Sequence, residues 1–132
     1  MLADGRFEAM KSLFGFYGDM LPVSKARTQK WFNITGTFFP ETKQQTGLYD
    51  SGGLGWGCKS ASATVPTPSN SYIRYHREGG LEIGLMMVDW LDHTDDVMYW
   101  KSMLLPQIEA YVDYYAQHFE DDATTGKLDM FP

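Results

Sequence analysis

Carboxylates next to aromatic and proline residues are the groups in this sequence best suited to chemistry, and Glu41 is the first of them. It directly follows Phe38, Phe39 and Pro40, and Pro40 stiffens the backbone that carries it. Apolar surroundings raise the pKa of a carboxyl group and suit it to donate a proton, so Glu41 is a candidate general acid. The alternative is that Glu41 caps its own loop or forms an ion pair within it.

Two more carboxylates are candidates for a second acid. Asp50 lies beside Tyr49 and near Trp56, and flat aromatic rings close to a carboxylate are typical of a sugar-binding site. The same three residues could instead anchor the loop. Glu82 lies in the apolar stretch "LEIGLMMVDWL" and is expected to be buried, where a carboxylate must be paired, hydrogen-bonded or neutral. A structural buried pair and a functional acid both remain open for Glu82.

Arg74 and Arg77 open the next helical pattern and are candidate contacts for a polyhydroxylated substrate. Arg74 also stands four residues before Glu78, so surface ion pairing is the competing interpretation. The histidines show no metal-ligand spacing, and the sequence contains no phosphate-binding loop, Ser-His-Asp arrangement or dinucleotide fingerprint. We therefore expect neither a metal nor a cofactor.

Composition favours one folded domain covering residues 1–132. The chain is 43% hydrophobic and 15% aromatic, which is too much apolar bulk for a disordered segment. Its net charge is -6 with no run of basic residues, so nucleic acid is not an expected partner.

The single Cys58 leaves the redox compartment open. The sequence shows no signal-peptide pattern and no apolar run of about 20 residues, so we expect a soluble chain outside the membrane, cytoplasmic as given.

Periodicity predicts an all-α fold with three main helices at about 5–33, 71–93 and 95–119, and one long ordered loop at 34–70. Pro22 predicts a kink near 18–22 in the first helix, and Pro106 predicts a kink or a division in the third. Apolar stripes predict the core-facing sides of the first and third helices: Phe7, Met10, Phe14, Tyr17, Leu21; Val97, Trp100, Leu104, Ile108, Tyr111, Tyr115. Thr94 is the predicted cap of the third helix. The last residues predict a turn and a short extended piece.

The second helix is apolar on nearly every face, which is typical of a helix surrounded by protein. Two other helices cannot enclose it. We therefore predict self-association, as a homodimer that packs this helix against its copy.

Three segments together resemble part of the catalytic domain of bacterial six-hairpin glycosidase-like proteins: "LPVSKARTQKWFNITGTFFPET", "NSYIRYHREGGLEIGLMMVDWLDHT" and "LLPQIEAYVDYYAQHFEDDATTGKLDMFP". The resemblance implies about one and a half hairpins of an (α/α)6 toroid, from a family whose members are expected to be exported. The first and third helices would be outer, the second inner, and the 34–70 loop would lie on the active-site face. It also implies a truncated glycoside hydrolase-like protein with Glu41 as general acid and Glu82 or Asp50 as the second carboxylate. The alternative is a non-catalytic interaction or carbohydrate-binding homo-oligomer.

Overall fold

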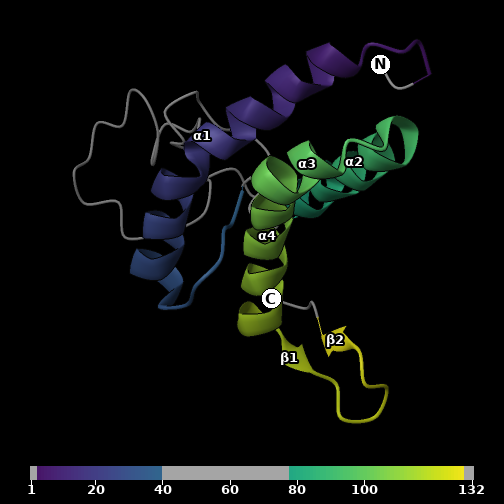
Figure 1. Cartoon of the computed structure of the whole chain (residues 1–132). Coiled ribbons are helices and arrows are strands. Elements are labelled where there is room, and N and C mark those ends of the chain that lie inside the picture. The colour runs from purple at the N-terminus through teal and green to yellow at the C-terminus, as the bar shows by residue number, and fades with distance from the viewer. Residues whose placement is uncertain (1–2, 40–77, 130–132) are drawn as a thin grey trace.

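The computed structural model describes residues 3–39 and 78–129 of the chain. Three helical rods dominate these residues, which confirms the all-α prediction (Figure 1). The third rod consists of two α-helices joined through a π-helical turn. The elements are α1 (Phe7–Phe32), α2 (Gly79–Thr94), α3 (Val97–Tyr99), the π turn η1 (Trp100–Leu104), α4 (Leu105–His118), and the strands β1 (Glu120–Asp121) and β2 (Leu128–Asp129).

Helix α1 follows the predicted pattern closely. Met10 and Phe14 are buried at 1% and 0% exposure, and the other residues of the stripe are partly buried against the same core. The helix runs through Pro22 without a break, and Figure 1 shows its axis changing direction near its middle, as a missing backbone donor predicts. It ends where Asn33 adopts a left-handed φ of 58° and donates its backbone N–H to the Gln29 carbonyl.

Helix α2 is only partly enclosed in the single chain. Ile83, Met87 and Trp90 face the core at the spacing of one helical side. The opposite side leaves an apolar row exposed: Leu81, Leu85, Val88. The other two rods cover only one side of α2 and do not enclose it, as the sequence predicts, and the self-association expected for this reason stays a prediction. Residues 71–77, the predicted first turns of this helix, lie outside the described residues.

The third rod starts later than predicted, because Asp95 at a left-handed φ of 53° ends α2. Asp96 then caps the rod, and its Oδ1 accepts the Tyr99 N–H at 3.0 Å. Thr94, the predicted cap, instead donates its hydroxyl to the Trp90 carbonyl at 2.8 Å.

The π turn η1 ends two residues before Pro106 and divides this rod there, which agrees with the kink or division predicted at that proline. A π turn holds more residues than an α turn and so rotates the residues on its two sides relative to each other. Val97 precedes η1 and is 48% exposed, whereas Leu104 and Tyr111 are fully buried. The prediction that Val97 continues the buried stripe is wrong for this reason.

The core has two parts. The larger one lies where the three rods meet: Met10, Phe14, Met20, Phe39, Ile83, Met87, Trp90, Leu104, Tyr111. The smaller one lies between the end of α1 and the end of α4: Phe38, Tyr114, Tyr115, Phe119. The extended segment 34–39 contributes a ring to each part and so fastens α1 to α4.

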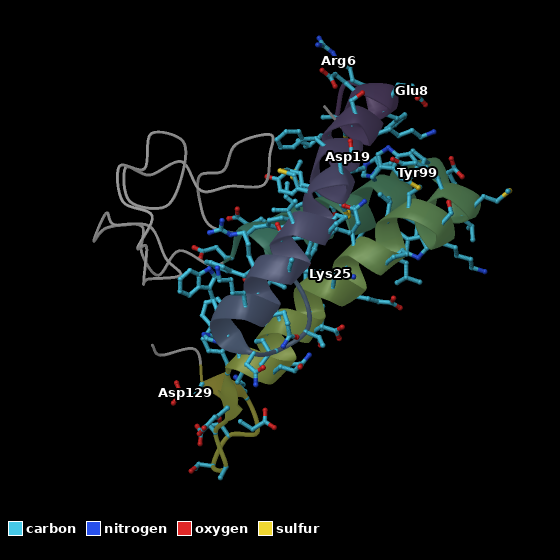
Figure 2. All side chains as sticks on the ribbon, turned by 90° about the vertical axis from the view of Figure 1, so that its left-hand side faces the viewer. Arg6, Glu8, Asp19, Lys25, Tyr99 and Asp129 are labelled. Carbon is cyan, nitrogen blue, oxygen red and sulfur yellow. The ribbon has the colours of Figure 1, made fainter. Side chains whose placement is uncertain are left out.

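At the other end of α1, Lys11 connects this helix to the third rod. Its Nζ lies 3.2 Å from Glu8 and 3.6 Å from Asp96, and 5.0 Å from the ring centre of Tyr99. Figure 2 shows Glu8 and Tyr99 at this end of the molecule. The hydrogen bond that Lys11 donates to Glu8 is the main cause of the raised pKa of Lys11.

The chain's last described residues form an antiparallel hairpin, where a turn and an extended piece are predicted. Glu120 pairs with Asp129, and Asp121 with Leu128. Asp122 holds the turn by accepting the Thr125 hydroxyl at 2.7 Å and the Thr124 N–H at 2.8 Å. These hydrogen bonds lower the pKa of Asp122, and the one from the Thr125 hydroxyl has the largest effect.

Candidate functional site

Most residues of the predicted sugar site lie outside the described part of the chain. The described residues include Glu82 but not the other candidates: Glu41, Asp50, Tyr49, Trp56, Arg74, Arg77. The predicted loop 34–70 is described only as far as Phe39, where it forms an ordered extended segment. The roles of these residues remain predictions.

Phe39 and Gly79, which come just before and soon after the segment 40–77 in the sequence, lie close together in the fold. A Cβ built on Gly79, the first residue of α2, would lie 3.7 Å from the Phe39 carbonyl oxygen. The Phe39 ring is fixed here by edge contacts with Tyr17 and Tyr111, each with ring centres 5.4 Å apart. The chain therefore leaves and rejoins the described structure at the start of α2.

Glu82 lies on the first turn of α2, three residues after this junction, and it is exposed. The expectation of a buried Glu82 is wrong, because Glu82 does not lie on the side of α2 that packs on the core. Burial, and then the charge of Glu82, raise the pKa of the half-buried Tyr17. Tyr17 thus keeps its phenolic proton well above neutral pH and is a hydrogen-bond donor near a carboxylate.

Tyr111, behind this junction, has a structural role. Its hydroxyl donates to Gln107 Oε1 at 3.1 Å, and Gln107 Nε2 donates to the Met103 carbonyl at 2.9 Å. Burial raises the Tyr111 pKa strongly. Gly18 makes room for this pair, since a Cβ there would lie 3.1 Å from Gln107 Nε2. The pair joins α1 to the third rod and offers no reactive group.

A polar hollow of about 430 Å³ lies between α1, the segment 34–36 and α4. Lys25, Gln29, Thr35 and Asp113 contribute its polar lining. Gln117 bonds both the backbone and the hydroxyl of Thr35. The described lining of this hollow holds one carboxylate, Asp113, whereas glycoside hydrolysis uses two. The described residues of the hollow therefore do not supply the acid pair of a glycosidase.

An apolar groove of about 230 Å³ runs between α2 and α4, and we refer to it as the α2–α4 groove. Its floor is Tyr111, which packs against the glycines of α2: the nearest Tyr111 atom is 3.4 Å from a Cβ built on Gly80 and 3.6 Å from one built on Gly84. Aliphatic side chains form its walls: Leu81, Leu85, Val88, Ile108, Val112. The sequence prediction included the wall from α2 and placed Ile108 on the apolar stripe of the third helix but missed Val112, which its spacing of four residues from Ile108 could have indicated.

Among the described residues no three His, Cys, Asp or Glu side chains come together in a way that could hold a metal ion. Nor do residues 3–39 and 78–129 contain a helix with the length and apolar character needed to cross a membrane.

Comparisons of the chain with protein-family models, with curated proteins and with solved structures found no match.

Proposed function

We propose that this protein functions by association, binding a further protein helix in the α2–α4 groove. The observation that carries this proposal is the exposure of aliphatic side chains on two adjacent helices. Leu85 is 64% exposed and Val112 is 50% exposed, with Leu81 and Val88 close to 40% beside them. Contiguous apolar surface of this kind marks an interaction site far more often than scattered single residues do.

The energy available in the groove is useful but limited. Covering the exposed parts of the four aliphatic side chains would contribute about 3–6 kcal/mol, since full burial of one such side chain contributes about 1.5–3 kcal/mol. Association costs about 4–15 kcal/mol in lost translational and rotational freedom. Apolar contact in the groove alone therefore gives weak binding, and the polar surroundings of the groove decide the affinity.

A homodimer that packs α2 against its copy is one form of this association. Sedimentation velocity across a range of protein concentrations measures this form. Methyl NMR of Leu85, Val88 and Val112, with an added helical peptide that has an apolar face, measures binding of a different helix.

The substitution Leu85→Ser tests the groove in both measurements, with Met98→Ser as its matched control. Met98 is 84% exposed on α3 and does not line the groove. We expect Leu85→Ser to abolish association and Met98→Ser to preserve it. The proposal would be overturned if the protein sediments as a monomer at every concentration and the methyl NMR signals of the groove do not change when the peptide is added.

Glycoside hydrolysis or carbohydrate binding is the second candidate, as implied by the resemblance to six-hairpin glycosidase-like proteins. The meeting of Phe39 and Gly79 supports it, because the segment with the predicted acids joins the structure beside Glu82 and Tyr17. The test is turnover of a panel of aryl glycosides by the wild-type chain and by Glu41→Gln and Glu82→Gln. Equal rates for all three proteins would remove both carboxylates from the chemistry.

A further inference from the structure

We propose that the α2–α4 groove binds a basic amphipathic helix of another protein, with its apolar side in the groove and Lys or Arg residues along both edges. This inference rests on the function proposed above and names the partner class for the same groove. It follows from the charges around the groove and from the shape of its floor.

The helices that form the groove are acidic, and their only basic residues are His93 on α2 and His118 on α4. Between residues 78 and 118 the sequence contains eight Asp or Glu residues and one Lys, Lys101, which lies on η1. Neither α2 nor α4 contains a Lys or Arg. A partner helix in this groove therefore lies between two acidic helices.

Three exposed carboxylates lie beside the apolar walls. Asp89 and Asp92 are each four residues after a wall residue of α2, Leu85 and Val88 respectively, and Glu109 is three residues before Val112 on α4. Residues three and four apart are neighbours on a helix surface. The aliphatic walls are therefore edged by Asp89 and Asp92 on one side and by Glu109 on the other.

This distribution disfavours a second copy as the occupant. A closed homodimer brings the same surface of each copy together, so the acidic edges of one groove would meet the acidic surface of the other copy. Like charges across an interface oppose association, and neither α2 nor α4 has a Lys or Arg to offset them. A helix with basic edges meets the opposite condition, because each of its cations approaches a carboxylate.

The groove also has the dimensions for a short helix. From Gly80 to Val88 the wall of α2 covers about two helical turns, or roughly 12 Å. Tyr111 fills the space against Gly80 and Gly84, so the floor is formed before any partner arrives. Apolar residues at positions i, i+4 and i+7 of the partner match this length, as in other cases where a helix binds in a groove.

Titration of the full chain with designed peptides tests the inference. The probe is a helical peptide of about four turns with Leu at i, i+4 and i+7 and Lys on both edges. One control peptide has Glu in place of each Lys, and a second has the basic sequence scrambled to destroy its apolar face. Binding is measured by fluorescence anisotropy and its location by methyl NMR of the groove.

We expect the basic amphipathic peptide to bind at least tenfold more tightly than either control, and more weakly as salt rises. The double charge reversal Asp89→Lys with Glu109→Lys should remove that preference and favour the Glu peptide. Both residues are exposed, and circular dichroism checks that the helices remain.

The outcomes separate this inference from the proposed function. Equal binding of the Lys and Glu amphipathic peptides, abolished by Leu85→Ser, would overturn the basic partner and leave a groove that binds helices. Self-association that Leu85→Ser abolishes, with no preference for the Lys peptide, would overturn it in favour of the homodimer. No binding and no self-association would overturn both proposals.

Discussion

At the scale of single residues, Gly36 has the least room for a side chain among the glycines that the structure describes. Its φ of 88° is in the left-handed region, and a Cβ there would lie 2.4 Å from the Tyr114 backbone nitrogen and 2.9 Å from the Ala110 carbonyl oxygen. The next residue, Thr37, donates its N–H to that same carbonyl at 2.7 Å. The backbone of the segment 34–39 thus packs directly against the backbone of α4, and a side chain at position 36 would separate them.

We predict that Gly36→Ala lowers the free energy of unfolding by about 3 kcal/mol or more, because a clash with backbone adds to the strain of a positive φ. Gly126→Ala is the matched control, since Gly126 has a φ of 64° but nothing within 4 Å of its Cβ position. That control should lose about 1 kcal/mol. Urea unfolding followed by circular dichroism measures both, and equal losses would show that the close approach at Gly36 contributes nothing.

At the scale of elements, the sequence predicts the helices well where periodicity alone determines them. The stripe of α1 identifies Met10 and Phe14 correctly, because an uninterrupted helix keeps its register. The stripe of the third rod fails at Val97, since a period of 3.6 residues assumes no π turn. The exposure of Glu82 also differs from the prediction, because the number of apolar neighbours in sequence does not reveal which side of α2 the other rods cover.

The contact between α1 and the segment 34–39 depends on Thr28, which is 1% exposed. Its hydroxyl donates to the Ser24 carbonyl at 3.0 Å and accepts the Phe38 N–H at 3.1 Å. This single side chain therefore satisfies a buried backbone donor that belongs to a different element. The spacing of the α1 stripe continues after Leu21 to Ser24 and Thr28, so periodicity places Thr28 on the core-facing side but does not reveal its hydrogen bonds.

We predict that Thr28→Val lowers the free energy of unfolding by about 1–3 kcal/mol, the usual consequence of leaving a buried donor without an acceptor. Valine keeps the shape of threonine, so the loss reports the hydrogen bond and not a cavity. Thr28→Ser, which retains the hydroxyl, should lose less. Amide exchange at Phe38 gives a local measure, and unchanged protection in Thr28→Val would contradict the prediction.

At the scale of the whole molecule, sequence reasoning predicts the helical class and an exposed apolar helix but not the place of a site. Six of the seven predicted site residues lie outside the described part of the chain. The α2–α4 groove was not predicted because it depends on how the two helices pack side by side, with Tyr111 on Gly80 and Gly84, and residue spacing does not reveal that packing. Its acidic edges belong to residues that sequence patterns treat as ordinary solvated positions.

The three rods depend on one another through Phe39, which is 2% exposed. Its ring contacts Tyr17 from α1 and Tyr111 from α4, and its carbonyl lies at Gly79, where α2 begins. Removing the ring would open a cavity where all three rods meet. The change should therefore weaken the entire fold and not one helix.

We predict that Phe39→Ala lowers the free energy of unfolding by about 3–5 kcal/mol, the range for truncating a buried aromatic side chain. Val23→Ala, at a site on α1 that is 39% exposed, should change it by less than about 0.5 kcal/mol. Because Phe39 touches all three rods, amide exchange should accelerate in α1, α2 and α4 together. Acceleration limited to α1 would mean that α2 and α4 hold together without Phe39, and that the junction beside Glu82 is not a shared centre of the fold.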